Sequence, residues 1–111
     1  MEVNTLSPPA VPVKKAVLLC FLPPATSREA VQERTFMTTF SQGLQQRLPD
    51  LVRVLNVDQM AHPDVVSSFN LTQLPALVLV HHGVERWRQE GVRAWEERTL
   101  LPHLLERIKE L

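Results

Sequence analysis

Residues 16–29 read Ala-Val-Leu-Leu-Cys-Phe-Leu-Pro-Pro-Ala-Thr-Ser-Arg-Glu, and the fold is decided in this stretch. The run from Ala16 to Leu22 is continuously apolar, which is typical of a strand covered on both faces of a sheet. The two prolines that follow end this strand. Thr26 and Glu29 then have the spacing of a capping box, in which each side chain accepts from the other residue's amide. The stretch therefore predicts a buried strand followed directly by a helix over about Ser27–Leu48.

Further elements follow at regular intervals along the chain. The sequence predicts strands at Leu51–Val57, Ala76–Val80 and Val84–Glu90, and a short helix from His62 to about Phe69. The last helix begins either at a Thr99 cap or near residue 94 with a kink at a proline, and we prefer the Thr99 start. The order β-α-β-α-β-β-α predicts an α/β fold with a four-stranded mixed sheet flanked by helices.

Composition limits the classes of function. The chain has 111 residues, the size of one domain, and its 12 basic and 12 acidic residues balance. Neither a basic field for nucleic acid nor a polybasic run for an anionic membrane is present. Glu2 stands where a signal peptide carries Lys or Arg, so we expect a cytoplasmic protein. Residues 1–13 include Pro8, Pro9 and Pro12 and predict a flexible lead-in to a domain over 14–111.

Several segments in this order resemble the thioredoxin superfamily. Val17–Phe21 is similar to the first core strand of that family, and Asn56–Asp58 is similar to the end of the next one. Phe69–Val80, with Pro75 just before the third strand, is similar to the segment that carries the cis-proline of the family. Gly83 and Gly91 stand where the following hairpin and the end of the last strand have glycines. The resemblance implies a thioredoxin-like fold without the first β-α unit of thioredoxins.

The same resemblance implies that the redox chemistry is missing. Thr26 and Glu29 occupy the positions of the two redox cysteines, and Cys20 stands in the place of the buried acid that assists proton transfer. A threonine hydroxyl does not replace a thiol, because its pKa is far higher and it forms no mixed disulfide. The sequence therefore argues against a dithiol enzyme.

Two neighbouring segments form the expected binding site. Leu22, Pro23, Pro24 and Ala25 make an apolar stretch, called the rim here, which is continued by Thr26. The resemblance implies that the rim faces Leu74 and Pro75, where the backbone of the residue before the cis-proline binds an extended peptide. Surface patches of this kind often bind partners, although the same residues could instead pack internally or only shape the entry to the strand. The leading hypothesis is a redox-inactive chaperone or adaptor module that binds a protein or peptide in extended conformation.

Alternative hypotheses rest on other features. Cys20 could serve a divergent single-cysteine thiol-disulfide oxidoreductase, although its apolar surroundings favour a structural role. The start of the first helix could receive an anionic or thiol-bearing ligand such as glutathione. An edge strand could pair across a two-fold axis in a homodimer. No metal site or cofactor is expected, because His81 and His82 point to opposite faces of a strand and no ligand spacing surrounds them.

Overall fold

The computed structural model of the chain describes residues 16–111, so the predicted lead-in over 1–13 lies outside the described residues. The order of the elements is the predicted one. The elements are β2 (Ala16–Leu22), α1 (Arg28–Arg47), β3 (Val52–Asp58), α2 (Pro63–Ser68), β4 (Ala76–His81), β5 (Val84–Glu90), the 3-10 turn η3 (Ala94–Glu96) and α3 (Glu97–Lys109).

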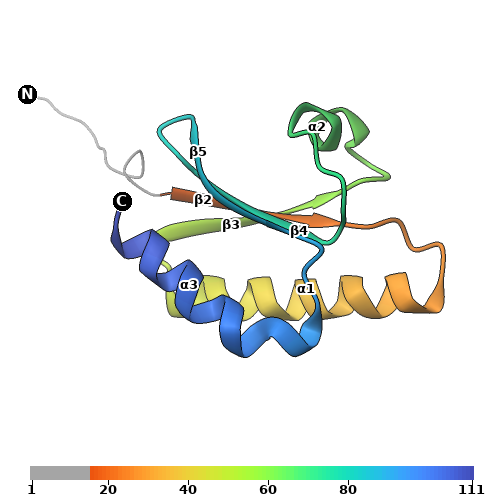
Figure 1. The fold of residues 1–111 in the computed structure, drawn as a ribbon, viewed down its shortest axis with the longest axis horizontal. Coiled ribbons are helices and arrows are strands. Elements are labelled where there is room, and N and C mark those ends of the chain that lie inside the picture. Colours follow the sequence, from red (N-terminus) through yellow and green to blue (C-terminus); the bar gives the residue numbers. More distant parts are fainter. Residues whose placement is uncertain (1–15) are drawn as a thin grey trace, which may run out of the picture.

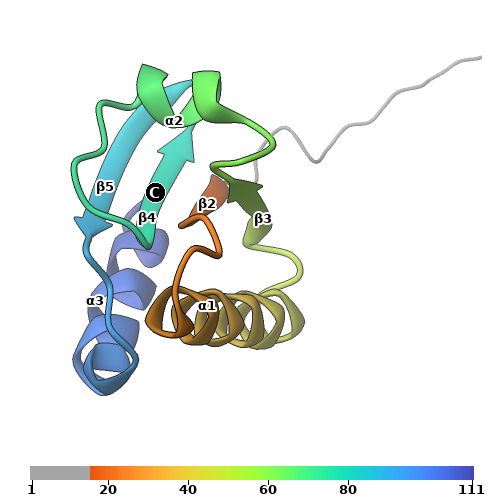
Figure 2. The ribbon, with the colours of Figure 1, turned by 90° about the vertical axis from the view of Figure 1, so that its right-hand side faces the viewer.

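The strands form one four-stranded sheet in the order β3-β2-β4-β5. β3 runs parallel to β2, whereas β4 is antiparallel to both β2 and β5. Helices α1 and α3 lie on one face of the sheet and the short helix α2 lies on the other, as Figures 1 and 2 show from two directions. The predicted mixed sheet with flanking helices is therefore confirmed.

Alternation along the central strands explains why both faces are covered. Leu18 and Cys20 of β2 point into the cluster beneath α1 and α3, whereas Phe21 points into the cluster beneath α2. β4 behaves in the same way, with Leu77 and Leu79 on the first face and Ala76 and Val78 on the second. A strand with apolar neighbours on both faces needs a continuous apolar run, which is what the sequence provides.

The start of α1 differs from the expected capping box. The cap is Ser27, whose hydroxyl accepts from the Ala30 amide at 3.0 Å, and the helix begins at Arg28. The reason is a tight turn, in which the Thr26 amide donates to the Pro24 carbonyl at 2.9 Å. Because that turn uses the Thr26 amide, helical geometry starts one residue later, and the predicted pairing of Thr26 with Glu29 is wrong.

The start of α3 also differs from the preferred prediction. The chain becomes helical at η3, and the Arg93 amide donates to the Glu96 carboxylate at 2.9 Å, so Thr99 is not the cap. Pro102 consequently lies inside α3 rather than in its first turn. The backbone bond that this proline removes leaves a carbonyl at Arg98, an exposed residue where water can serve as donor. Among the described residues, no helix combines the length and the apolar character needed to cross a membrane.

Candidate functional site

The predicted site residues meet at one end of the sheet. Phe21 and Ala76 form the last pair between β2 and β4, so the segments 22–26 and 71–75 leave the sheet side by side. The same end carries the start of α1, which follows the first of these segments (Figure 2). The register therefore brings the rim and the Leu74–Pro75 segment together, although they lie far apart in the sequence.

The structure divides the rim into a buried and an exposed part. Leu22 is only 6% exposed because it continues the inward alternation of β2, and Pro23 is buried as well. Pro24 is half-buried, whereas Ala25 and Thr26 are exposed. The side chains of Leu22 and Pro23 therefore belong to the interior, which is the internal packing that the sequence left open. The exposed part of the rim therefore begins at Pro24.

An arginine that sequence reasoning missed fixes this segment. Arg34 of α1 donates from Nη1 to the Pro23 carbonyl at 2.7 Å and from Nη2 to Asp58 Oδ2 at 2.8 Å. The Met60 amide donates to the other carboxylate oxygen of Asp58 at 2.9 Å. The hydrogen bond from Arg34, and then the one from Met60, lower the pKa of Asp58. Arg34 thus links α1 to the end of β3 and to the rim. No local sequence pattern predicts this contact.

Leu74 and Pro75 lie directly before β4, in the segment that leaves the sheet next to the rim. The Leu74–Pro75 peptide bond is cis, Pro75 is buried, and its carbonyl accepts from the Val92 amide at 2.9 Å. The Leu74 side chain is half-buried and packs against the cluster on the α2 face. Within residues 16–111, no group hydrogen-bonds the Leu74 amide or carbonyl. The Leu74 amide and carbonyl are therefore backbone hydrogen-bonding groups without a partner among the described residues.

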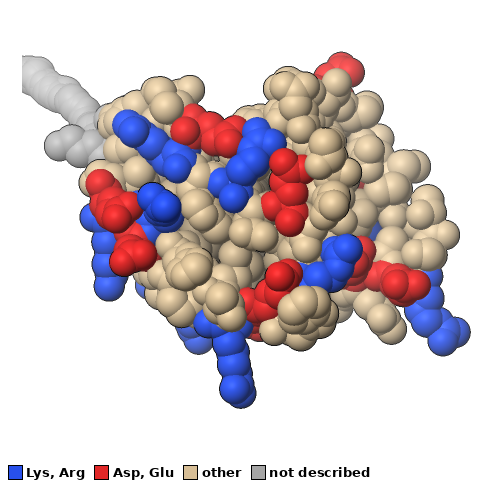
Figure 3. Space-filling view, viewed as in Figure 1, with Lys and Arg blue, Asp and Glu red and all other residues tan. Residues whose placement is uncertain are grey.

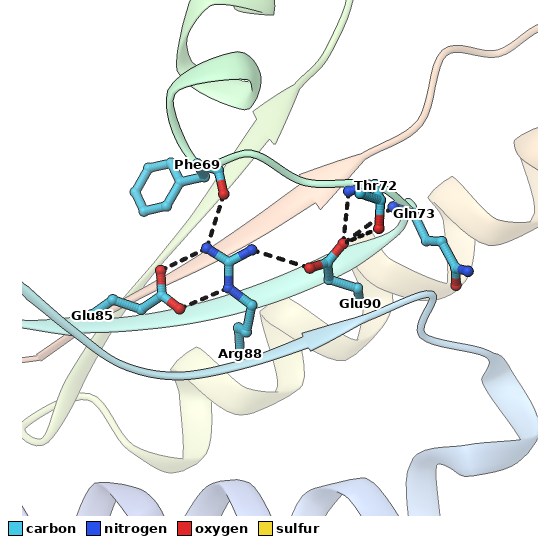
Figure 4. Close-up of polar contacts among 6 residues, drawn as sticks. All are labelled: Phe69, Thr72, Gln73, Glu85, Arg88 and Glu90. Carbon is cyan, nitrogen blue, oxygen red and sulfur yellow. Dashed lines mark hydrogen bonds and ion pairs between the residues drawn. The ribbon is translucent and has the colours of Figure 1, made fainter.

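Glu90 of β5 organises the loop before Leu74 (Figure 4). Its Oε1 accepts from the Thr72 amide at 2.7 Å, the Thr72 hydroxyl at 2.9 Å and the Gln73 amide at 3.2 Å. Its Oε2 accepts from Arg88 Nη1 at 3.1 Å. The bonds from Thr72, followed by the bond from Arg88, lower the pKa of Glu90 to about 2. The two loop amides that precede Leu74 are therefore satisfied within the chain.

Arg88 completes this network through a bulge in β5. One extra residue of β5 separates the pairs Leu79–Trp87 and Val80–Glu85, so Glu85 and Arg88 lie on the same face of the sheet. Both Glu85 oxygens accept from Arg88 at 2.7 Å, and the hydrogen bond lowers the pKa of Glu85. Arg88 also donates to the carbonyl of Phe69 at 2.9 Å, at the start of the loop. Strict alternation would have placed Glu85 and Arg88 on opposite faces, which is why the sequence did not reveal this pair.

The Glu90 network predicts a particular dependence of stability on pH. Because the folded pKa lies below the ordinary value, the stabilisation is complete above pH 4.5 and is lost as the pH falls toward about 2. Glu90→Gln turns an amide donor toward Arg88, so we expect lower stability at neutral pH and a weaker fall in acid. Denaturant unfolding of both proteins across this pH range measures the effect. Thr72→Val, which keeps the backbone donors, should show a smaller loss, and identical acid profiles for the wild type and Glu90→Gln would contradict the assignment.

Cys20 lies apart from this surface. Its side chain is 0% exposed within the cluster beneath α1 and α3, and burial raises the pKa of the thiol to about 12. Thr26 and Glu29, the positions that the resemblance assigned to redox cysteines, are both exposed near the start of α1. The described part of the chain contains no group of three or more His, Cys, Asp or Glu residues placed to hold a metal ion.

The charges on one broad face of the molecule are mixed in sign (Figure 3). On the face that Figure 3 presents, basic and acidic side chains are interspersed rather than gathered by sign. This distribution agrees with the formal net charge of zero. The described part of this face shows no single-sign field that would steer a charged molecule (Figure 3).

Several known structures have a similar backbone fold. The thioredoxin of Fasciola hepatica superposes with a TM-score of 0.62 at 16% identity and covers 81% of both chains. A mutant thioredoxin of Entamoeba histolytica gives a TM-score of 0.62 at 19% identity, over 84% of this chain and 81% of that one. Mitochondrial thioredoxin 3 of Saccharomyces cerevisiae gives a TM-score of 0.60 at 22% identity, over 89% of this chain and 83% of that one. No protein-family model and no curated protein sequence matches the chain. The likeness shows that the chain has the thioredoxin-like fold.

Proposed function

We propose that this thioredoxin-like domain is a redox-inactive module that binds an extended segment of a partner protein, as a chaperone or an adaptor in the cytoplasm. The partner segment would lie along the backbone of Leu74 and against the exposed part of the rim, Pro24 to Thr26. Its backbone groups would pair with the Leu74 amide and carbonyl, and its side chains would contact the rim. Such pairing supplies affinity through the main chain and selectivity through the pockets beside it.

The main support for this proposal is the hydrogen bonding of the backbone around Leu74. The neighbouring amides of Thr72 and Gln73 are bonded to Glu90, and the Pro75 carbonyl is bonded to Val92. Among described residues, none bonds the amide or carbonyl of Leu74 itself. The loop is thus fixed by hydrogen bonds both before and after Leu74. Because its backbone is already ordered, binding of a peptide at Leu74 would cost little conformational entropy.

The single-cysteine alternative has weaker support. A nucleophilic cysteine reacts as the thiolate and needs a lowered pKa and access to its substrate. Cys20 is 0% exposed, and burial raises the pKa of its thiol to about 12. Both properties oppose catalysis, so the proposal assigns Cys20 to the core.

Selected peptides test the proposed function. Linear peptides chosen from a random display library against the wild-type domain should bind less tightly to Ala25→Glu, by at least about tenfold in Kd. The reason is that the added carboxylate is buried under the peptide at the exposed rim. Val84→Glu is the matched control, because Val84 is 51% exposed at the hairpin between β4 and β5, away from the rim. Equal affinity of the wild type and Ala25→Glu, or a loss in Val84→Glu alone, would contradict the proposal.

A further inference from the structure

The outer edge of β3 presents a defined set of backbone groups. The Ala16 amide donates to the Leu51 carbonyl at 3.3 Å, and the Gln59 amide donates to the Leu22 carbonyl at 3.2 Å. Odd-numbered residues of β3 therefore turn their backbone groups toward β2. Because these groups alternate along a strand, the even-numbered residues turn theirs away from the sheet.

Gln45 of α1 covers the first part of this edge. Its Nε2 donates to the Val52 carbonyl at 3.0 Å, and its Oε1 accepts from the Val54 amide at 2.8 Å. The side-chain amide thus makes the pair of bonds that one peptide unit of a neighbouring strand would make. Strand pairing is consequently blocked opposite Arg53 and remains open further along the strand.

The open part of the edge runs from Val54 to Asp58. In the part of the chain that the structure describes, no group bonds the Val54 carbonyl, the amide and carbonyl of Asn56, or the Asp58 amide. The Asp58 carbonyl is already used, because it accepts from the amides of Ala61 and His62 at 3.1 and 2.8 Å. Leu55 lies within this window and is 39% exposed. A row of unpaired backbone groups beside an exposed leucine is a template for another strand.

The opposite edge of the sheet is protected from pairing. β5 carries a bulge, which twists an edge strand, and its residues include the charged Glu85, Arg86, Arg88 and Glu90. Bulges and charges are the usual devices that prevent edge-to-edge association. In β3 the two charged residues lie at the margins of the open window, with Arg53 just before it and Asp58 at its last position. The β3 edge is therefore the one suited to strand addition.

We propose that the occupant of this edge is a second copy of the chain, with the two β3 strands antiparallel about a two-fold axis at Asn56. In this register the amide and carbonyl of Asn56 pair with those of Asn56 in the second copy. The Val54 carbonyl accepts from the Asp58 amide of the second copy, and the symmetric bond forms as well. Every open donor then meets an open acceptor, and the groups already used by Gln45 and the turn after β3 stay outside the window. This self-complementarity is what a two-fold interface requires.

The side chains agree with this register. Leu55 lies opposite Val57 of the second copy, which forms an apolar pair across the new strand boundary. Asp58 lies opposite Val54 of the second copy and Arg53 lies outside the paired window, so no like charges face each other. The formal net charge of zero adds no repulsion between copies. Pairing through one strand covers less than a standard interface, so the dimer should be weak and depend on concentration.

Mass measurement over a concentration series tests the proposal on the full chain. Sedimentation between about 1 μM and about 1 mM should show the mass of the wild type rising toward that of a dimer. Leu55→Lys and Asn56→Pro should each weaken association by at least about tenfold. Proline at position 56 removes only an outward-facing amide, so the β2–β3 bonds survive, and circular dichroism checks that both variants fold. Val84→Lys, the same kind of change at an exposed residue of β5, should associate like the wild type.

Amide hydrogen exchange identifies the edge. Protection of the Asn56 and Asp58 amides should increase with protein concentration. Protection that is equally strong at every concentration would mean that the edge is covered within one chain, which overturns the proposal. A monomeric mass throughout, or a dimer disrupted by Val84→Lys but not by Leu55→Lys, would overturn it as well.

Discussion

Phe21→Ala is expected to lower the free energy of unfolding by about 3–5 kcal/mol, the usual cost of removing a fully buried phenylalanine. The Phe21 side chain is 0% exposed in the cluster beneath α2. Its ring centroid lies 5.4 Å from that of Phe69, the residue whose carbonyl accepts from Arg88. Because a domain of this size has a total stability of about 5–15 kcal/mol, the loss would leave the variant close to unfolding. The same change loosens the loop that leads to Leu74.

Urea unfolding of Phe21→Ala beside the wild type measures this effect. Val84→Ala is the control, since an exposed side chain should change the stability by no more than about 0.5 kcal/mol. If Phe21→Ala does not fold, Phe21→Leu keeps part of the ring volume and should show an intermediate loss. A loss below about 1 kcal/mol for Phe21→Ala would contradict the placement of this ring in the core.

Cys20 is expected to react with an aromatic disulfide reagent at least about a thousandfold more slowly in the folded protein than in denaturant. The thiol is 0% exposed, and burial raises its pKa to about 12. The reagent therefore cannot reach the sulfur, and very little of the thiol is present as the reactive thiolate. Reaction must then wait for an opening of the core, whose equilibrium constant sets the rate.

Thr26→Cys in a Cys20→Ala background is the matched control for this experiment. Its thiol would be exposed next to the start of α1, where the helix dipole favours a thiolate, so it should react rapidly without denaturant. Rapid reaction of Cys20 in the folded protein would contradict its structural role and would support the alternative of a single-cysteine oxidoreductase.

The sequence predicted the arrangement of the sheet because burial leaves a direct pattern. Continuous apolar runs at β2 and β4 follow from cover on both faces, and the observed register confirms it. The Phe21–Ala76 pair then places the rim beside Leu74, as the resemblance implied. What the sequence left open was how much of the rim is surface, because Leu22 is apolar under either interpretation. Its side chain follows the alternation of β2 and is buried.

Contacts between distant polar residues could not be predicted in the same way. The Arg34–Asp58 ion pair, at 2.8 Å, joins α1 to the end of β3 and depends on their packing rather than on local spacing. The pair of Glu85 and Arg88 depends on a bulge that no residue type in β5 marks. The cap at Ser27 depends on a turn that uses the Thr26 amide. In each case the tertiary structure decides a local outcome.

The proposed function rests on one claim, that an extended peptide pairs with the backbone of Leu74. The direct measurement is an amide-resolved nuclear magnetic resonance titration of the wild-type domain with a display-selected peptide. We predict that the largest shifts fall at the amides of Leu74, Ala25 and Thr26, and that exchange of the Leu74 amide with solvent slows on binding. Shifts confined to another surface, such as the groove between α1 and α3 lined by Thr39, Gly43 and Leu101, would contradict the claim.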